Sequence, residues 1–338
     1  MINIGLIGCG QWGNNHIRVF HGLRECRVVA AADQSVERLT RVQQQYPAIE
    51  CIPDVGELLA RPDIHAVIVA TPAATHYSIV TEALHARKHV LCEKPLCMNT
   101  LEARKLYDLA FASGVVLSVG HVFLYNAGIA KLKELIEAGH VGDLYYVSAT
   151  RTNLGPIRED VNVSYDLATH DISIFNWLLD AIPETVTATG ASFIQPQLED
   201  VIFITLRYPR GTIGAVQTSW LSPRKVRKIA LVGSRKMVTW DDLELNTPVA
   251  IYDRGANAKL EYNEYGEFLR ISMWDGDVRL PSVAREEPLR TQDMAFLRSI
   301  REGTVDRNGC EFVVGVVRVL EAVAESLRRG GDPVRVSI

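Results

Sequence analysis

Residues 2–13 read INIGLIGCGQWG, an apolar run that ends on three glycines in the spacing G-x-G-x-x-G. Ile2–Ile7 predicts a β-strand, and Gly13–Leu23 predicts a helix soon after it. A glycine motif of this spacing is weak by itself, but here it joins a strand to a helix and opens a strand–helix–strand unit. The stretch therefore predicts the phosphate-binding turn of a Rossmann-type domain.

Each residue of this loop has a physical role in that interpretation. Gly8 allows the tight turn, Gly10 lets the backbone approach a pyrophosphate, and Gly13 lets the helix pack closely on the strand. Gln11 and Trp12 follow at the helix N-terminus, where free N–H groups and the positive end of the helix dipole favour phosphate. These residues are the first candidates for cofactor contacts. The alternative interpretation is a plain turn that holds no ligand.

The choice of nucleotide is predicted from the residue after the second strand. Asp33 directly follows the expected strand Arg27–Ala32. A carboxylate there accepts hydrogen bonds from the ribose hydroxyls of adenosine, and it repels the extra phosphate of NADP. The next residue is Gln34 and not an arginine, which leaves that phosphate without an evident partner. We therefore expect NAD as the cofactor; in the alternative interpretation Asp33 is only a helix cap.

Strands and helices alternate through the first third of the chain, which predicts an α/β domain with a parallel sheet and right-handed crossovers. Ser35 and Asn99 are expected to cap helices, and Gly114 to end one. We place this Rossmann domain at residues 1–121. The further elements expected in it are the strands Ala66–Ala70, His89–Cys92 and Val115–Val119, and the helices Val36–Tyr46, Thr75–Ala86 and Thr100–Ser113.

After about His121 the pattern changes to consecutive strands joined by short turns, which is typical of an antiparallel sheet. Residues 122–338 are therefore predicted to form an α+β domain on a large, mostly antiparallel sheet, for substrate binding and oligomerisation. Residues 254–287 fit either a hairpin or a loop. The expected helices are Ile129–Ala138, Asp166–Leu179, Thr291–Arg301 and Cys310–Arg328, and the expected strands are Leu144–Thr150, Thr185–Phe193, Val201–Tyr208, Thr212–Trp220, Val226–Val232 and Lys236–Trp240.

Charge and composition argue against several classes of protein. The chain has 36 basic and 40 acidic residues, a net charge of −4, whereas a general nucleic-acid binder needs a basic surface. No apolar run approaches the roughly 20 residues that span a bilayer, and no signal-peptide pattern opens the sequence, so we expect a cytoplasmic protein without a membrane partner. The six cysteines form no Cys-x-x-Cys pair, so we expect neither disulfides nor a metal site.

Three further segments carry reactive side chains. They read ATPAATH at 70–76, KHVLCEKP at 88–95 and DLATHD at 166–171. On these segments the chain resembles the glucose–fructose oxidoreductase / inositol dehydrogenase / MocA family over nearly its whole length, and EKP is the most specific mark. The resemblance implies an NAD-dependent oxidoreductase that moves a hydride between a secondary alcohol of a sugar and the nicotinamide. It also implies a cis peptide bond before Pro95.

The ends of two expected strands supply residues beside the nicotinamide. Thr71 and Pro72 follow one strand, and Glu93 and Lys94 follow the next; strand ends in a Rossmann sheet face the cofactor. The positive nicotinamide and partial desolvation would both lower the pKa of Lys94, which makes it useful as a proton donor or as a group that polarises an oxygen. His76 is expected near the cofactor, where it orients backbone and does not react.

Asp166 and His170 stand four residues apart on an expected helix and so share one face. The resemblance places the family's acid/base histidine at His170, with Asp166 nearby, and a histidine can take the alcohol proton as hydride leaves carbon. The alternative is an N-cap at Asp166 and a core histidine at His170. Asp171 is expected to be structural. The histidines expected at the surface or as caps are His16, His21, His65, His85, His89 and His140.

The segment RTNLGPIREDVN, which begins at Arg151, is expected to form a wall of the substrate pocket. Arg151 and Arg158 could hold a phosphate or carboxylate in a bidentate way, with Asn153 beside them; the alternative is that both arginines face solvent. Tyr125 and Asn126 stand where members of the family place sugar-contacting residues.

Three functions follow from these patterns. The first is a dehydrogenase acting at C3 of a nucleotide-linked sugar, such as a UDP-N-acetyl-hexosamine or its uronate, because residues 154–162 resemble that branch of the family and the arginines suit an anion. The second is a dehydrogenase of a free polyol or sugar, such as an inositol. The third is a non-catalytic nucleotide sensor, against which Lys94 and His170 argue. Apolar strands such as 201–204, and the family's habit of pairing its sheets, predict a homodimer or homotetramer.

Overall fold

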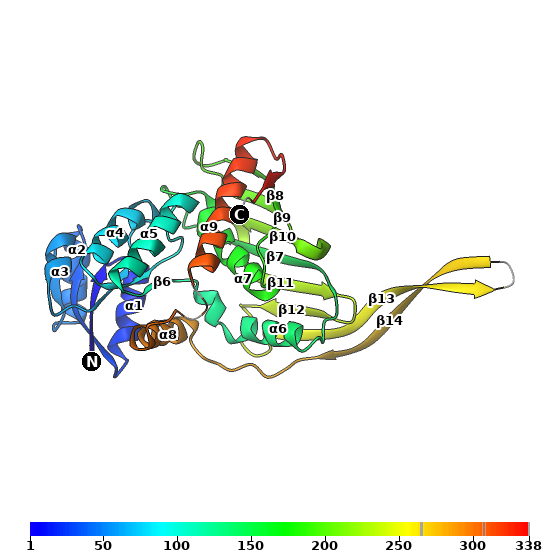
Figure 1. Ribbon diagram of the computed structural model, residues 1–338, viewed down its shortest axis with the longest axis horizontal. Coiled ribbons are helices and arrows are strands. Elements are labelled where there is room, and N and C mark those ends of the chain that lie inside the picture. The colour runs from blue at the N-terminus through cyan, green and yellow to red at the C-terminus, as the bar shows by residue number, and fades with distance from the viewer. Residues whose placement is uncertain (264–265, 306, 308, 337–338) are drawn as a thin grey trace. The chain divides into compact units, whose positions relative to one another are not determined.

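The computed structural model describes residues 1–263, 266–305, 307 and 309–336. The chain divides into two compact units, which the colours of Figure 1 help to follow along the sequence. The first unit contains Met1–Tyr125 and Glu286–Glu321, and the second contains Asn126–Arg285 and Ala322–Ile338. Each unit is therefore completed by a segment that is distant in the sequence.

The first unit is built on a six-stranded sheet in the order β3-β2-β1-β4-β5-β6, with every neighbouring pair parallel. The strand order reverses between β1 and β4, and this switch point is where doubly wound sheets bind nucleotides. The predicted Rossmann sheet is confirmed. Its strands are β1 (Ile2–Ile7), β2 (Cys26–Ala32), β3 (Glu50–Ile52), β4 (Ala66–Val69), β5 (His89–Cys92) and β6 (Leu117–Val119).

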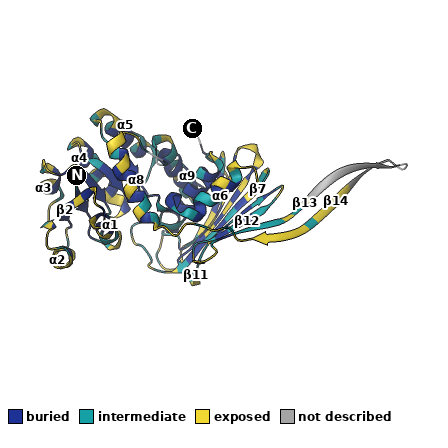
Figure 2. Cartoon of the chain, turned by 90° about the horizontal axis from the view of Figure 1, so that it is seen from below, coloured by how far each residue is buried: buried dark blue, intermediate teal, exposed yellow. Residues whose placement is uncertain are grey.

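Helices cover both faces of this sheet, and its central strand β4 is buried along its whole length. Figure 2 shows the burial of each residue along the chain. Ser35 accepts a hydrogen bond from the backbone N–H of Arg38, and Asn99 accepts one from Glu102, which confirms both predicted caps. The helices are α1 (Gln11–His21), α2 (Val36–Gln45), α3 (Val55–Ala60), α4 (His76–His85), α5 (Thr100–Ser113), α8 (Pro288–Glu302) and the first part of α9 (Cys310–Arg328), with 3₁₀ turns at Ala73–Thr75 and Val122–Tyr125.

The second unit is built on a nine-stranded sheet in the order β14-β13-β12-β11-β7-β10-β9-β8-β15. Among the described strands of this sheet only β7 and β10 pair in parallel, so the predicted, mostly antiparallel sheet is confirmed. The strands are β7 (Leu144–Leu154), β8 (Thr185–Ala191), β9 (Val201–Arg207), β10 (Ile213–Ser219), β11 (Leu221–Gly233), β12 (Met237–Asp241), β13 (Val249–Asn263), β14 (Gly266–Arg279) and β15 (Val334–Arg335).

One face of this sheet packs in the interior and the other is open. Buried and exposed residues alternate along β9 and β10, as the pleat of a half-buried strand requires. The helical elements of the unit are α6 (Ala127–Glu137), a π-helical turn (Ser164–Ala168), α7 (Thr169–Leu179), a 3₁₀ turn (Pro209–Gly211) and the end of α9.

The two compact units differ in their bounds from the predicted domains, 1–121 and 122–338. The first unit extends to Tyr125, and Glu286–Glu321 returns to it. The physical reason lies in the apolar face of α8, where Phe296 and Leu297 join the core formed by Ile17 and Phe20 of α1. A helical pattern shows that a face must be buried, but it does not show against which unit.

The region left open between hairpin and loop, residues 254–287, is largely a hairpin. β13 and β14 pair from Ile251↔Arg279 to Asn263↔Gly266, and β12 pairs with β13 only at residues 249–252, so the hairpin runs beyond the sheet as a two-stranded ribbon (Figure 1). Residues 264 and 265 of this region lie outside the described residues. The sequence patterns also missed the short elements β3, α3 and β15.

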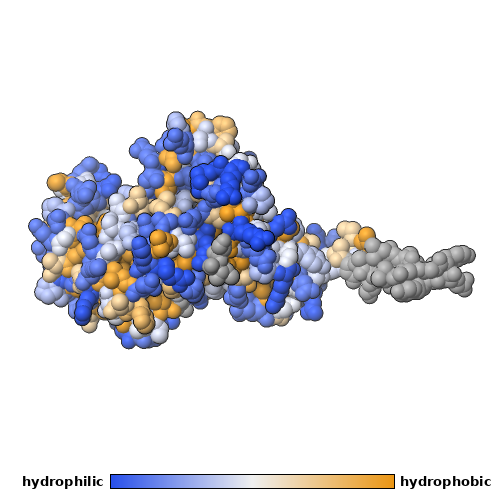
Figure 3. Space-filling model, turned by 45° about the horizontal axis from the view of Figure 1, so that its top comes forward, coloured by the Kyte–Doolittle hydropathy of each residue, from blue (hydrophilic) through white to orange (hydrophobic). Residues whose placement is uncertain are grey.

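None of the described helices is both long enough and apolar enough to cross a bilayer. Hydrophilic and apolar side chains are interspersed on the face of the molecule that Figure 3 presents.

Candidate active site

The glycine loop after β1 leaves space where a phosphate would lie. A Cβ on Gly8, whose φ is +96°, would lie 2.7 Å from the backbone of Ala70, and a Cβ on Gly13 would lie 1.9 Å from the carbonyl oxygen of Gly8. These two glycines are needed for packing. A Cβ on Gly10 would meet nothing within 4 Å, so this glycine borders open space, as an approach to a pyrophosphate requires.

The start of α1 suits an anion. The helix begins at Gln11, has no acidic residue in its first turn, and no described side chain caps its N-terminus. Its first N–H groups are therefore left for a ligand. The side chains of Gln11 and Trp12 are exposed beside them. The residues present thus fit the pyrophosphate of a dinucleotide.

Asp33 is tied to this loop by two hydrogen bonds. The backbone N–H of Cys9 donates to its Oδ2 at 2.7 Å, and that of Ser35 donates to its Oδ1 at 2.8 Å. Each carboxylate oxygen keeps a further lone pair for a ribose hydroxyl. Arg38, on α2, brings Nη1 to 3.5 Å from Oδ2. The prediction considered only Gln34 as a partner for a second phosphate and missed this arginine one turn into the helix.

The ends of β4 and β5 lie side by side, because Val69 pairs with Cys92. Thr71 and Pro72 therefore leave the sheet at the same edge as Glu93 and Lys94. The Lys94–Pro95 peptide is cis, as the resemblance implied.

His76 holds these two strand ends together. Its Nδ1 lies 2.7 Å from the carbonyl oxygen of Pro95, and its Nε2 lies 2.9 Å from that of Thr71. Carbonyl oxygens only accept hydrogen bonds, so the ring acts as a donor between the loops. This is the backbone-orienting role expected for His76.

Glu93 turns inward and contacts a histidine that was expected at the surface. His16 is fully buried, with Nε2 3.0 Å from Oε1 of Glu93 and Nδ1 3.1 Å from Oδ2 of Asp293. The expectation for His16 is therefore wrong. Its partners lie on β5 and α8, far along the chain, so no local spacing could identify them. Glu93 belongs to this buried cluster rather than to an open cofactor contact.

His121, which marked only the expected end of the domain, is a buried imidazole at the same edge. Burial, reinforced by the nearby charge of Lys94, lowers its pKa to about 4, and the charge of Glu93 only partly opposes this effect. Neither ring nitrogen has a hydrogen-bond partner among the described residues, and Phe312 packs edge-on against the ring. Unsatisfied buried polar groups are rare in native proteins. This histidine is a functional candidate that the sequence patterns missed.

In the second unit, Asp166 lies in the π-helical turn and His170 is the second residue of α7. The predicted helix is thus present, but its first turn is wider than an α-helical one. Oδ2 of Asp166 accepts a hydrogen bond from the indole N–H of Trp220 at 2.9 Å, and its Oδ1 lies 3.7 Å from Nη1 of Arg158. Asp166 therefore does not stand as a simple N-cap.

Both arginines of the predicted anion clamp are paired with aspartates in this structure. Arg151 is buried, and its Nε and Nη2 each donate to Asp171 at 2.8 Å. Arg158 donates to both carboxylate oxygens of Asp160, at 2.8 and 2.6 Å. Both arginines thus pair with aspartates of the same unit, and the substrate contacts predicted for them stay a prediction.

The amides and the tyrosine predicted to contact the sugar also have internal partners. Oδ1 of Asn126 accepts the N–H of Gly128 at 2.8 Å and caps α6. The side-chain amide of Asn153 donates to the carbonyl oxygen of Gly155. Tyr125 is buried, with the guanidinium of Arg307 5.4 Å from its ring centroid. These three side chains therefore have contacts within the protein, and the sugar contacts predicted for them stay a prediction.

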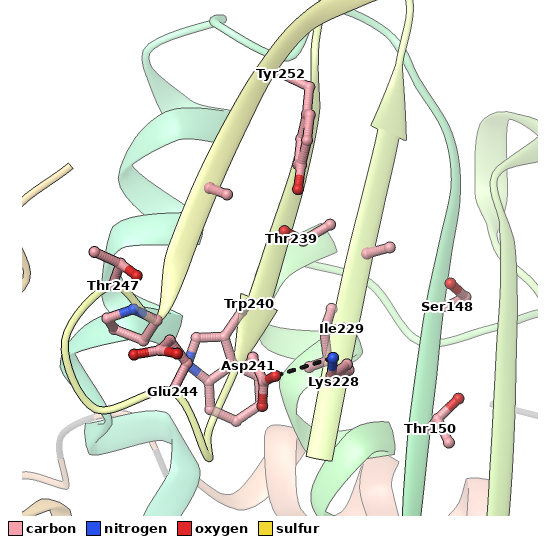
Figure 4. Close-up of a pocket in the computed structure, with 13 residues that line it drawn as sticks. Ser148, Thr150, Lys228, Ile229, Thr239, Trp240, Asp241, Glu244, Thr247 and Tyr252 are labelled. Atoms are coloured by element: carbon pink, nitrogen blue, oxygen red, sulfur yellow. Dashed lines mark ion pairs between the residues drawn. The ribbon is translucent and has the colours of Figure 1, made fainter. Parts of the chain in front are cut away.

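A cavity of about 490 Å³ opens on the second unit's sheet between β7, β11, β12 and β13 (Figure 4). Ser148 and Thr150 line one side, and Lys228 pairs with Asp241 at 3.1 Å across it. None of the residues predicted to bind cofactor or substrate lines this cavity, so we do not assign it to the active site.

Comparison with known proteins finds the same family in both parts of the chain. Residues 2–121 match an oxidoreductase family with an NAD-binding Rossmann fold, and residues 129–239 match the GFO/IDH/MocA C-terminal domain.

Individual relatives act on different compounds. An inositol 2-dehydrogenase of Gluconacetobacter diazotrophicus is 34% identical over 218 residues, 62% of this chain and 65% of that protein. A UDP-N-acetylglucosamine 3-dehydrogenase of Acidithiobacillus ferrooxidans is 27% identical over 252 residues, 75% of this chain and 77% of that protein. The crystal structure of GenD2 from gentamicin A biosynthesis, in complex with NAD, is similar with a TM-score of 0.83 at 24% identity, over 100% of this chain and 97% of that one.

Proposed function

Because the chain belongs to the GFO/IDH/MocA family of NAD-binding oxidoreductases, we propose that it oxidises a secondary alcohol of a sugar or polyol and passes the hydride to NAD. The observation that carries this proposal is the shared edge of β1, β4 and β5, which brings the glycine loop, Thr71 and Lys94 to the switch point of the sheet. Ligands of doubly wound sheets bind at that edge.

In this proposal Lys94 polarises the alcohol oxygen and His170 takes its proton. NAD supplies the hydride acceptor. The role of Lys94 is supported by its place directly after β5, and that of His170 by the resemblance of residues 166–171. Asp166 is proposed to orient its neighbours, since its carboxylate already accepts from Trp220.

Two observations bear on the substrate class, and they favour different classes. The filled forks of Arg151 and Arg158 favour an uncharged polyol or sugar, because a phosphate would have to displace a paired aspartate from either arginine. The resemblance of residues 154–162 favours a nucleotide-linked sugar. An inositol 2-dehydrogenase and a UDP-N-acetylglucosamine 3-dehydrogenase are both similar to this chain.

A substrate panel tests the proposal. Purified protein with NAD is offered inositols, free hexoses, UDP-N-acetylglucosamine and its uronate, and reduced nicotinamide is followed by its absorbance. Oxidation of at least one compound by the wild type, and loss of that activity in Lys94→Ala, is the expected result. If the wild type binds NAD but oxidises none of these compounds, the proposal that the protein is an enzyme is contradicted, and a nucleotide sensor is favoured.

We further propose that the open face of the nine-stranded sheet pairs with the same face of a second copy. The strand register aligns one row of small, uncharged residues across it, namely Thr187, Thr205, Ala215, Ser148, Ala230 and Thr239. Beside the row, Tyr146, Phe203 and Ile213 are 43%, 52% and 39% exposed. A sheet face with an uncharged row of residues across it suits an isologous, face-to-face contact.

Light scattering tests this assembly. The wild type should have the mass of a dimer or tetramer, and Ala215→Arg, which puts a charge in the middle of the row, should lower it. Ala112→Arg, on an exposed site of α5, is the matched control and should leave the mass unchanged. A wild type with the mass of one chain would refute the proposal.

A further inference from the structure

Three ionisable side chains from separate elements form a closed cluster inside the first unit. His16 comes from α1, Glu93 follows β5, and Asp293 comes from α8. His16 and Asp293 are each 0% exposed and Glu93 is 7% exposed. The imidazole lies between the two carboxylates, at 3.0 Å from Glu93 and 3.1 Å from Asp293.

The geometry fixes what the ring does. Ionised carboxylates only accept hydrogen bonds, so a ring with a carboxylate at each nitrogen donates from both. Burial alone lowers the pKa of His16, but the charge and hydrogen bonds of Asp293 and Glu93 outweigh it and raise that pKa to about 10. Burial also opposes the ionisation of Glu93, yet the hydrogen bond and charge of His16 hold its pKa below the ordinary value.

Glu93, which His16 holds in place, in turn contacts the backbone of Lys94. Its Oε2 accepts the backbone N–H of Lys94 at 3.2 Å. The carboxylate lies close against Gly120, where a Cβ would be 3.1 Å from Oε1. His16, the cluster's other member next to Glu93, lies on α1, the helix that begins in the glycine loop.

We propose that His16 is a positioning residue: by donating from both ring nitrogens it fixes Glu93, and through Glu93 it fixes the backbone amide of Lys94 relative to the glycine loop. This inference rests on the proposed function, since the position of Lys94 matters only if Lys94 acts on the substrate. His16 is buried on the helix that carries the phosphate loop, and it is assigned no contact with substrate.

The groups around the cluster show why the two carboxylates need the positive charge of His16. Gln292 donates to Oδ1 of Asp293 at 3.4 Å. The charged or titratable neighbours of Glu93 include, besides His16, Lys94, His121, Asp293 and Cys92. Removing His16 would leave two buried carboxylates without their cation, which is strongly unfavourable. Glu93 would then move or take up a proton, and Lys94 would lose its fixed amide. A neutral side chain of similar length at residue 16 lacks the positive charge with which the imidazole donates to both carboxylates.

A double-mutant cycle tests the proposal on the full-length protein. His16→Gln and Glu93→Gln should each lower kcat by about 10²-fold, the size expected when a catalytic group is displaced by about 1 Å, while the Kd of NADH changes little. The double variant should be no slower than either single variant, because both changes break one chain of contacts. His21→Gln, the same substitution at an exposed site of α1, should keep wild-type kcat.

Additive losses in the cycle would overturn the proposal, because His16 would then act independently of Glu93. Asp293→Asn keeps a hydrogen-bond acceptor at Nδ1 and serves if His16→Gln does not fold; it should lower kcat in the same direction.

A spectroscopic readout needs no variant and no substrate. The ¹⁵N spectrum of wild-type His16 at about pH 8, where an ordinary histidine is neutral, should show both ring nitrogens protonated. A ring with one bare nitrogen would overturn the proposal. A protein that oxidises no sugar yet shows the doubly protonated ring would instead overturn the proposed function, so the two failures are distinguishable.

Discussion

Replacing Asp33 by serine should turn the cofactor preference of this protein toward NADP. The carboxylate of Asp33 lies at the end of β2 beside the glycine loop, where it accepts from Cys9 and Ser35. Arg38 already stands 3.5 Å away, with its side chain 54% exposed. The substitution removes a negative charge and leaves a ready cation, so no second substitution at Gln34 is needed.

The magnitude follows from the charges involved. At an effective dielectric constant of about 20, two unit charges about 4 Å apart interact by about 4 kcal/mol. Arg38 is an exposed partner of the buried Asp33. Ion pairs of exposed side chains contribute only about 0.2–1 kcal/mol, so we expect Arg38 to offset little of the repulsion in the wild type. Asp33→Ser should strengthen NADP binding by about 10²–10³-fold, since each factor of ten is about 1.4 kcal/mol. NAD should bind about 10- to 100-fold more weakly, because its ribose loses a charged acceptor.

Fluorescence titration of the purified protein with NADH and NADPH measures both dissociation constants. Arg38→Ala is the matched control: it should change little in the wild type and should reverse part of the gain in Asp33→Ser. A wild type that binds NADPH as tightly as NADH would refute the assignment of Asp33. An Asp33→Ser variant whose NADPH affinity is unchanged would refute the electrostatic argument.

Four other perturbations test the roles proposed for Lys94, His170, Arg151 and His16. Lys94→Ala should lower turnover by about 10²-fold or more with NAD binding largely intact, and His170→Ala should do likewise and flatten the pH dependence near neutrality; steady-state kinetics over pH measures both. Arg151→Ala should destabilise the protein by about 3–5 kcal/mol in urea unfolding, because it leaves the buried Asp171 unpaired; unchanged stability with a raised KM would restore Arg151 as a substrate contact. Because the pKa of His16 is raised from 6.5 to about 10, its contribution to stability should be full below pH 6.5 and lost as pH rises toward 10. The unfolding free energies of wild type and His16→Gln should therefore approach each other at the alkaline end.

The parts of the fold that depend on residues close together in the sequence could be predicted from it. The glycine loop, the caps at Ser35 and Asn99 and the end of α5 at Gly114 all stand where expected, because each is a local device acting within a few residues. The change from alternating elements to consecutive strands likewise predicted the second sheet. The return of α8 to the first unit could not be predicted, because it depends on which apolar face is left uncovered.

Side-chain roles were harder to predict, because residue type does not reveal a distant partner. His16 meets Glu93 77 residues away and Asp293 277 residues away. Arg151 looked like an anion clamp, but its partner Asp171 is 20 residues away on the following helix. An arginine fork suits an internal carboxylate as well as it suits a phosphate.

The distinction between internal partners and ligands narrows the search for the substrate contacts. Arg151, Arg158 and Asn126 each have hydrogen-bond partners within the protein, so a ligand would compete with those bonds. By contrast, the first N–H groups of α1 have no described side-chain cap, and both ring nitrogens of His121 lack described partners. Because a buried polar group without a partner is unfavourable, such groups gain most from a bound molecule. They lie at the strand ends of the first unit, beside Lys94, which supports a binding site that begins at this edge rather than in the arginine segment after β7.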